Sequence, residues 1–496
     1  MQALQRPIRC KLNDFSIFNN LYIDDNLIKS QSQQLCKFQA LFYFFMVQCA
    51  GWSLAPDKTM TSPVKKCKYL GFLIDSSSMY ISAEQIKCSY VISQITEVNL
   101  LSEALTPIPA QHIAHVAGLL VHLTVSHGEL LRVAARTMQH ELGVCVAKNG
   151  WKGNLILSKQ AIAELQLIKE ILKRFNGRKM NMKLHRIEIE FPVKDIIFVK
   201  DLPDCHISDV LVSDSSESHS FIFNCNATLT MLEEFTTDIK ALSSTYREIM
   251  AFVNLIRNKP ESFQQYRNSI VVWITDSRCT FFTMSRGSRN FAIQKLIIEL
   301  LQFQLEHNFL IKVTWKSRDS NILQIADQGS KFLTQSTEYG VDHATFQEMC
   351  RVFQVTPTVD GFASHLNRRC EIFFSVIPLP ETSGVDFFAQ KLSTDHIYYL
   401  DPPVKLLIKV IYTVLDAGVT AILSLPVWRT RSFWSVITDF KYFKPFVGKA
   451  FFYKPFFVNF GKNKNFFRSY MPFPHLFILI SKDFKEKIMI PHMGKY

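Results

Sequence analysis

The sequence lacks the cysteine patterns that hold zinc-binding or disulfide-rich domains together. Its 496 residues include 11 cysteines, an odd number, with no Cys-x-x-Cys pair and no ladder of cysteine and histidine. Because structural zinc sites and disulfide frameworks need paired ligands, both are disfavoured, and a reducing compartment fits better. The N-terminal segment carries Arg6, Arg9 and Lys11 without an apolar core, so we predict no secretory signal. We expect an intracellular protein of the cytoplasm or the nucleus.

Long apolar runs are scarce as well. The charge-free stretch Phe38–Pro56 has the length of a membrane span. It is interrupted by Gln48 and Trp52, and it stands alone. We therefore predict a buried amphipathic helix over Cys36–Cys49 that ends at Gly51, and no association with a membrane.

Acidic residues are fewer than basic ones. Lys and Arg total 56 against 43 for Asp and Glu, a net charge of +13, which favours a polyanionic partner. Hydrophobic residues make up 48% and charged residues 20%, as in ordinary globular domains, so global disorder is disfavoured. From Lys441 to the end, 11 basic residues face two acidic ones, a net of +9, so the tail holds most of the basicity.

The local patterns predict a multidomain α/β (α+β) chain. Apolar residues flank an acidic pair over Leu21–Ile28, which predicts a strand-turn-strand, and Tyr69–Ile74 is typical of a strand before a serine turn. Helical spacing prevails from Ala83 to Lys173. We place the boundaries so that the segments are 1–90, 91–180, 181–335, 345–440 and 441–496.

Strands and helices alternate in the third segment, which predicts a mixed α/β domain. The expected strands there are Asp209–Ser213, Ser220–Asn224, Ser269–Thr275 and Leu310–Trp315, and the expected helices are Ser244–Ile256 and Ala292–His307. After a polar linker at Thr334–His343, the expected strands are Glu371–Val376, His396–Leu400 and Thr420–Leu425, with a helix over Val404–Leu415. No internal repeat is visible, and the phenylalanine-rich tail has no assignable fold.

Four carboxylates lie on this strand-and-helix framework. Asp214 and Asp276 end apolar strands, Glu248 lies in a helical run, and Asp327 follows the last strand. A carboxylate at the end of a buried strand is costly unless its charge is compensated. Several of them from different elements suggest a site for magnesium, which prefers oxygen ligands. The alternative is that each acid caps a helix or faces solvent, as single acids usually do.

Short motifs surround these acids: Ser243–Glu248, Thr275–Ser277, Arg286–Ser288, Trp315–Arg318, Asn321 and Ala326–Asp327. With them, residues 205 to 333 resemble the RNase H domain behind reverse transcriptases, specifically that of DIRS-type retrotransposons. The resemblance implies that Asp214, Glu248, Asp276 and Asp327 bind two Mg²⁺ ions and cut RNA in an RNA–DNA hybrid. After the first aspartate such domains usually carry glycine and another small residue, whereas this sequence has His219 and Phe221.

A second set of motifs lies near the N-terminus. Tyr22-Ile23-Asp24-Asp25 is followed by Gly51–Lys58 and by Tyr69–Phe72. This series resembles the reverse-transcriptase palm over residues 17 to 90, with a helical thumb and connection up to about residue 175. The resemblance implies that Tyr22, Asp24, Asp25 and Lys58 are remnants of a polymerase site, with the two aspartates as metal ligands. Two-metal nucleotidyl transfer needs a further carboxylate from an earlier strand, and 21 residues before Tyr22 are too few to supply it. We expect polymerase activity to be lost.

The last segment has motifs of its own: Thr358–Ser364, Asn367, Cys370, Gly384–Asp386, Asp401–Val404 and Leu425–Trp428. The series resembles the Dam-like (adenine-N6 methyltransferase-like) domain that DIRS-type elements carry. The resemblance implies roles for Asp360, Asp401, Pro402 and Pro403, with S-adenosylmethionine as a possible cofactor. Val404 stands where active enzymes have an aromatic residue that stacks on the flipped base. The alternative is a degenerate α/β domain with a structural Pro-Pro turn.

The tail interleaves lysines with aromatic residues such as Phe443 and Tyr453. That mixture suits single-stranded nucleic acid, but it equally suits apolar core strands rimmed by solvated lysines.

We interpret the chain as a retrotransposon-derived reverse transcriptase/RNase H protein that cleaves RNA in RNA–DNA hybrids with Mg²⁺. The expected partners are RNA–DNA hybrid, RNA and single-stranded DNA. The rival hypothesis is a catalytically inactive nucleic-acid-binding relic, and a methyltransferase is a third option.

Overall fold

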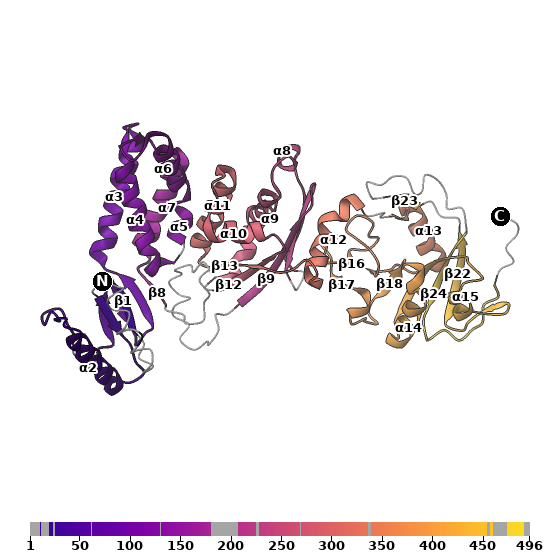
Figure 1. Ribbon diagram of the computed structural model, residues 1–496. Coiled ribbons are helices and arrows are strands. Elements are labelled where there is room, and N and C mark those ends of the chain that lie inside the picture. Colours follow the sequence, from indigo (N-terminus) through magenta and orange to yellow (C-terminus); the bar gives the residue numbers. More distant parts are fainter. Residues whose placement is uncertain are drawn as a thin grey trace. The chain divides into compact units, whose positions relative to one another are not determined.

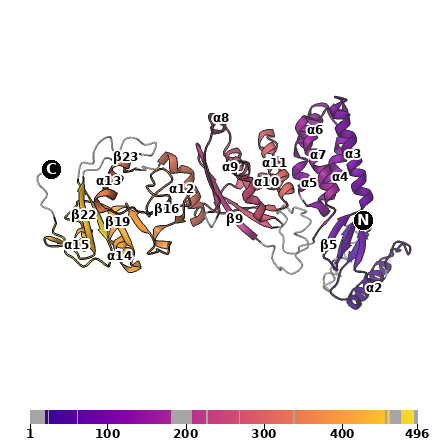
Figure 2. The same cartoon turned by 180° about the vertical axis from the view of Figure 1, so that it is seen from behind.

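The chain is a multidomain mixed α/β protein, as the sequence predicted (Figures 1 and 2). The computed structural model describes residues 10, 19–22, 25–60, 62–128, 130–179, 207–224, 228–267, 269–335, 339–453, 457–459 and 474–490. Two compact units emerge. The first comprises residues 1–206 and 282–310, and the second comprises residues 207–281 and 311–496.

The predicted strand-turn-strand near the N-terminus is an antiparallel hairpin. Strand β1 (Asn19–Tyr22) pairs with β2 (Asp25–Ile28), and Tyr22 lies opposite Asp25. Asp25 is exposed, as is Lys58 in the turn that follows the next helix. Asp24, the other predicted metal ligand of the hairpin, lies outside the described residues.

Helix α2 (Gln33–Cys49) is capped by the Ser32 side chain and ends just before Gly51, whose φ of +81° suits a helix stop. The expectation that this helix is buried was wrong, because only one side of it packs against the protein. Gln39, Tyr43 and Val47 are buried, whereas Phe38 and Phe45 are 64% and 61% exposed. Within the described part of the chain, no helix combines the length and the apolarity that crossing a membrane requires.

The single strand predicted over Tyr69–Ile74 is instead a tight hairpin. Strands β3 (Lys66–Tyr69) and β4 (Phe72–Asp75) are joined by Leu70 and Gly71, whose φ angles are +51° and +81°. Positive φ at both central residues defines the two-residue turn that matches the strand twist. Strand β5 (Tyr80–Ala83) pairs with β4, and β8 (Arg178–Lys179) pairs with β5.

Helices fill the rest of the first unit, as the spacing from Ala83 to Lys173 predicted. They are α3 (Gln85–Glu103), α4 (Ala110–His127), α5 (Leu130–Ala134), α6 (Arg136–Asn149), α7 (Lys159–Arg174) and, from a distant part of the sequence, α11 (Phe291–His307). Short strands β6 (Ile108–Pro109) and β7 (Asn154–Leu155) pair with each other. Ile113, Val116 and Leu120 of α4 are fully buried at helical spacing.

A charged residue lies inside this helical bundle. The Glu164 carboxylate of α7 is fully buried and accepts hydrogen bonds from the Thr137 backbone N–H and hydroxyl at the start of α6. Burial raises the pKa of Glu164 to about 7, although the hydrogen bonds from Thr137 and Gln160 oppose the rise. The Glu164 carboxyl therefore caps the start of α6 and is partly protonated near neutral pH.

The second unit begins with a mixed five-stranded sheet in the order β11-β10-β9-β12-β13. Its strands are β9 (Ile207–Ser215), β10 (His219–Asn224), β11 (Thr230–Glu234), β12 (Ile270–Thr275) and β13 (Leu310–Trp315). Strands β9, β10 and β11 are antiparallel neighbours, and β12 runs parallel to β9. Between and after them lie α8 (Thr237–Lys240), α9 (Ser244–Asn258), η2 (Pro260–Tyr266), α10 (Arg278–Arg286) and α12 (Asn321–Gln335).

Helices α9 and α12 cover opposite faces of this sheet (Figure 1). Adjacent residues of β9 make the contacts: Asp214 accepts a hydrogen bond from Ser330 of α12, and Ser215 donates to Glu248 of α9. Because successive side chains of a strand point to opposite faces, the two helices flank the end of β9.

The C-terminal part of the second unit is a seven-stranded sheet in the order β17-β16-β15-β18-β19-β24-β22. Its strands are β15 (Val359–Asp360), β16 (Ile372–Ser375), β17 (Gly384–Val385), β18 (Ile397–Leu400), β19 (Thr420–Pro426), β22 (Val447–Tyr453) and β24 (His475–Ile480). The first five in this order are parallel, and β24 is antiparallel to both of its neighbours.

Helices cover both faces of this sheet. Phe346 and Met349 of α13 (His343–Phe353) pack with Tyr399, while residues of α14 (Leu407–Ala417) pack with Tyr398 and Leu400. The remaining elements are β14 (Tyr339–Val341), which pairs with β23 (Phe457–Asn459), η3 (Phe387–Ala389), η4 (Val404–Leu406), α15 (Ser432–Ile437), β20 (Thr438–Asp439) and β21 (Tyr442–Phe443). The described part of residues 441–496 thus matches the alternative of apolar core strands, because β22 and the fully buried β24 complete the sheet.

Replacing Glu164 by Gln should change how stability depends on pH. The pKa of Glu164 is about 7 in the folded protein, whereas its ordinary value, which applies to the unfolded chain, is 4.5. Protonation of this carboxyl therefore favours folding. That contribution is complete below pH 4.5 and is lost as the pH rises through 7. The free energy of unfolding of the wild type minus that of Glu164→Gln should therefore fall by about 3 kcal/mol between about pH 4.5 and about pH 8. Urea unfolding of both proteins at several pH values measures the difference, and a pH-independent difference would contradict the assignment.

Candidate functional site

Three of the four predicted acids meet at the ends of strands β9 and β12. Asp214 lies near the end of β9, Asp276 follows β12, and Glu248 is in the second turn of α9. One carboxylate oxygen from each lies within 4.8 Å of the other two. Because β9 and β12 are parallel neighbours, their carboxyl ends lie at the same edge of the sheet, and this brings the two aspartates together.

Glu248 is the most enclosed member of the group. Its Oε1 accepts hydrogen bonds from the Ser215 backbone N–H at 2.9 Å and from the Ser215 hydroxyl at 2.8 Å. Burial raises the pKa of Glu248 to about 8; the charges of Asp214 and Asp276 act in the same direction, and the hydrogen bonds from Ser215 oppose the rise. Without a cation beside it, this carboxyl therefore carries a proton at neutral pH.

Asp214 is likewise buried, and a serine from the opposite side fixes its orientation. The Ser330 hydroxyl of α12 donates to Asp214 Oδ2 at 2.7 Å. Burial raises the pKa of Asp214, the Ser330 bond lowers it, and the charges of Asp276 and Asp327 raise it again. The charged forms of both buried acids, Asp214 and Glu248, are therefore disfavoured unless a positive charge lies beside them.

A cationic side chain already faces the third acid. Arg318 Nε donates to Asp276 Oδ2 at 2.7 Å, and an Nη2 nitrogen of the same guanidinium lies 2.7 Å from that oxygen. The Trp315 indole N–H donates to the Asp276 backbone carbonyl at 2.9 Å, and the Arg278 guanidinium lies 4.4 Å from the Trp315 ring centre. The block from Trp315 to Arg318 thus positions Asp276 through both its backbone and its side chain.

Asp327 lies outside this group of three. Its carboxylate pairs with Lys331, one turn later in α12, at 2.5 Å. Its charge nonetheless acts on Asp214, so it borders the site. The three grouped carboxylates have the chemistry that a hard divalent cation prefers, namely several oxygens from rigid elements around one point.

The structure has space for the bulky residues His219 and Phe221, which follow Asp214 where the family pattern has small residues. Phe221 lies directly opposite Asp214 in the β9–β10 pairing, and its ring is fully buried. A Cβ at Gly329 of α12 would lie 2.0 Å from the Phe221 ring, so glycine provides the space that the ring occupies. His219 is also fully buried, and its Nε2 lies 3.9 Å from the Glu234 carboxylate. The strand and its turn form regularly in spite of the added bulk.

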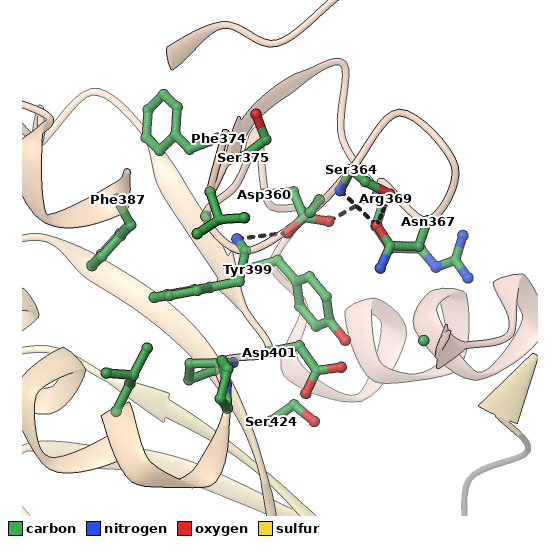
Figure 3. A pocket seen from close by; sticks show the side chains of 18 of the residues that line it. Asp360, Ser364, Asn367, Arg369, Phe374, Ser375, Phe387, Tyr399, Asp401 and Ser424 are labelled. Atoms are coloured by element: carbon green, nitrogen blue, oxygen red, sulfur yellow. Dashed lines mark hydrogen bonds between the residues drawn. The ribbon is translucent and has the colours of Figure 1, made fainter. Parts of the chain in front are cut away.

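A second candidate site lies at the carboxyl ends of β15 and β18. The sheet order changes direction there, because β15 is followed on one side by β16 and on the other by β18. In open parallel sheets such a switch point is where ligands bind. A cavity of about 670 Å³ occupies this position, and its lining includes Asp360, Asp401, Pro402 and Pro403 (Figure 3). Asp360 and Pro402 are buried, Asp401 is half-buried and Pro403 is exposed.

Two carboxyls, Asp360 and Asp401, and the Tyr399 hydroxyl face one another in this cavity (Figure 3). Asp360 accepts hydrogen bonds from the backbone N–H groups of Phe362 and Arg369. Burial raises the pKa of Asp360 to about 7 and that of Asp401 to about 6. The buried Tyr399 hydroxyl has no hydrogen-bond partner among the described residues, and burial next to both acids raises its pKa well above the usual value. These groups leave polar atoms available to a ligand.

Aromatic rings line the cavity although Val404 replaces the expected one. Phe362, Phe387 and Phe388 lie in its wall, and the ring centres of Phe362 and Phe387 are 5.0 Å apart. The cavity therefore combines flat apolar surface with a few converging polar groups, which is the usual composition of small-molecule sites.

Sequence reasoning missed the residues that position the acids. Ser330 and Lys331 lie three and four residues after Asp327, a spacing that places them one helical turn further on. That spacing was a usable signal for Lys331. Nothing in the sequence pairs Ser330 with Asp214 or Ser215 with Glu248, because those contacts join residues far apart in the chain.

No family model matches the sequence, and no curated protein matches it. Among solved structures, similar chains are foamy viral protease-reverse transcriptases. One is the dRH form in complex with double-stranded DNA (TM-score 0.28, 12% identity, 64% of this chain and 48% of that chain). Another is in complex with an RNA/DNA hybrid (TM-score 0.28, 11% identity, 64% and 38%), and a third is in complex with double-stranded DNA (TM-score 0.26, 12% identity, 61% and 55%). The chain spans about half or less of the length of these relatives.

Replacing Gly329 by Ala should destabilise the second unit by about 1–3 kcal/mol, because the new methyl group would overlap the Phe221 ring. In a Phe221→Leu background, which removes part of the ring's bulk, the same Ala substitution should cost clearly less. Urea unfolding of the four proteins measures this coupling. An equal cost in both backgrounds would show that the ring does not set the requirement for glycine.

Proposed function

We propose that this chain is a magnesium-dependent endonuclease that cuts the RNA strand of RNA–DNA hybrids, and that Asp214, Glu248 and Asp276 form its active site. The observation that supports the proposal is the approach of three carboxylates, from three separate elements, to within 4.8 Å. Two of them are buried acids whose charged forms need a neighbouring cation. A divalent cation would supply that charge, lower the pKa of an attacking water and stabilise the departing 3′ oxygen.

The chain's own residues would orient the ligands. Ser215 holds Oε1 of Glu248, and Oε2, which accepts a long 3.5 Å hydrogen bond from the Thr275 hydroxyl, would serve a cation. Ser330 does the same for Asp214, and Arg318 holds Asp276 from the exposed side of the site. Asp327 would contribute from the border of the site once it separates from Lys331. Selection of a hybrid would come from 2′-hydroxyl and backbone contacts, so we expect little sequence preference.

The rival proposal is a nucleic-acid-binding protein without catalytic activity. The residues that favour it are His219 and Phe221, which replace small residues of the family pattern. The space left by Gly329 weakens that objection, because it accommodates the larger ring. Dependence on magnesium separates the two proposals, since a binder needs no cation.

Cleavage of an end-labelled RNA–DNA hybrid tests the proposal. The wild type should cut the RNA strand only with Mg²⁺, and Asp276→Asn should lower the rate by about 100-fold or more because a metal ligand is lost. Asp319→Asn is the matched control, since Asp319 is an exposed acid a few residues from Arg318 and outside the group of three. Equal cutting by Asp276→Asn, or no cutting by a folded wild type that binds the hybrid, would overturn the proposal.

The cavity at β15 and β18 supports a second candidate function, the binding of S-adenosylmethionine. Its volume of about 670 Å³ lies within the range of small-molecule sites. Its acids, Asp360 and Asp401, would favour a ligand with positive charge, and Phe362 and Phe387 offer flat surfaces for a purine base.

Isothermal titration calorimetry with S-adenosylmethionine tests this candidate. Asp360→Asn should weaken binding about tenfold, because a carboxylate that pairs with a charged ligand contributes about 1.5 kcal/mol. Asp416→Asn should bind as the wild type does, since Asp416 is an exposed acid of α14 outside the cavity. An absence of binding heat from a folded protein would remove the candidate without affecting the nuclease proposal.

A further inference from the structure

The hydroxyl of Tyr399 is a buried polar group whose hydrogen bonds the surrounding protein does not make. Tyr399 lies in β18, two residues before Asp401, and is 3% exposed. Its hydroxyl has no hydrogen-bond partner among the described residues. A buried hydroxyl without a partner costs free energy, and native proteins rarely keep one in that state. Because this residue lines the cavity, the missing partner is expected to be a group of the ligand.

Packing fixes the direction of this hydroxyl. The Tyr399 ring meets the ring of Phe346 in α13 edge-on, with 5.1 Å between the ring centres. It belongs to the same buried core cluster as Met349 of that helix. Since core residues hold the ring, it cannot turn away to bring the hydroxyl to a partner elsewhere. In the cavity the hydroxyl faces the carboxyls of Asp360 and Asp401 (Figure 3).

The cavity wall has more acidic than basic groups. Its described residues include three acids, Asp360, Asp386 and Asp401. Arg369 is the one permanent cation among them, and its guanidinium donates to two backbone carbonyls. His475 also lies in the wall, but burial lowers its pKa to about 4, so it is neutral near pH 7. A ligand with a positive charge would therefore favour the charged forms of the acids.

We propose that the Tyr399 hydroxyl oxygen, together with the carboxyls of Asp360 and Asp401, binds a primary ammonium group of the ligand. An ammonium has three N–H donors and a positive charge, so it matches three acceptors in an acidic wall. Each oxygen of Asp360 accepts one backbone N–H and has a second lone pair for such a donor. A carboxylate would be repelled by both aspartates, and a sulfonium has no N–H to donate.

The inference rests on the second candidate function for its ligand. S-adenosylmethionine carries a primary ammonium on its amino-acid part, and Tyr399 would be a residue that recognises it. The same three acceptors would bind the ammonium of another small molecule equally well, so the site can be tested with and without S-adenosylmethionine.

Tyr399→Phe removes the hydroxyl and keeps the ring, so stability and affinity should move in opposite directions. The variant should melt at the same temperature as the wild type or higher, because a buried hydroxyl without a partner is removed. Its affinity for S-adenosylmethionine and S-adenosylhomocysteine, measured by isothermal titration calorimetry, should fall about tenfold, since both carry the ammonium. Its affinity for 5′-methylthioadenosine, which lacks the amino-acid part, should not change. An equal loss for all three compounds would overturn the assignment to the ammonium.

Tyr398→Phe is the matched control. Tyr398 precedes Tyr399 in β18 and packs in the core on the opposite face of the sheet. Its hydroxyl accepts a hydrogen bond from the Ser393 N–H at 2.9 Å, and it is not among the residues that line the cavity. This variant should therefore melt at a lower temperature than the wild type and bind all three compounds normally. A loss of affinity equal to that of Tyr399→Phe would show that the strand, and not the Tyr399 hydroxyl, determines binding.

Thermal unfolding with simple ammonium salts tests the site without S-adenosylmethionine. Methylammonium has three N–H donors, whereas tetramethylammonium has the same charge and none. At equal concentrations, methylammonium chloride should raise the melting temperature of the wild type more than tetramethylammonium chloride does. That difference should be lost in Tyr399→Phe and kept in Tyr398→Phe.

The outcomes separate this inference from the candidate function. If S-adenosylmethionine does not bind but methylammonium stabilises the wild type through Tyr399, the ammonium site stands and the candidate function fails. If S-adenosylmethionine binds the wild type and Tyr399→Phe equally, the candidate function stands and the ammonium site fails. If S-adenosylmethionine does not bind and methylammonium has no advantage over tetramethylammonium, both fail.

Discussion

Three carboxyl groups within 4.8 Å of one another create an electrostatic cost that the surrounding structure is arranged to offset. Ser215 and Ser330 donate hydrogen bonds to the two buried members, and Arg318 places a positive charge on the third. Glu248 reaches Ser215 from α9 on one face of the five-stranded sheet, and Ser330 reaches Asp214 from α12 on the other, so both helices must pack correctly before the acids are stabilised. The site and the sheet therefore depend on each other.

Much of the framework could be predicted from local patterns. The strand Leu310–Trp315 was predicted at its observed bounds, and the helix ending at His307 differed by one residue, because strong periodicity and clear breakers mark both. The Tyr69–Ile74 strand was wrong because an apolar run hid a two-residue turn at Leu70 and Gly71. Three acids of the site followed from strand ends, but the contacts of Ser330 and Ser215 could not, since they exist only after distant elements pack.

The position of β24 has a consequence for how the protein is made. This strand, His475–Ile480, is fully buried between β19 and β22, so the seven-stranded sheet is interrupted until it inserts. During synthesis, strands β15 to β19 leave the ribosome well before their partner and expose an open, apolar edge. The seven-stranded sheet must then close in a late step, and the cavity lined by Asp360 and His475 takes its final shape only after β24 has been translated, more than 100 residues after β15.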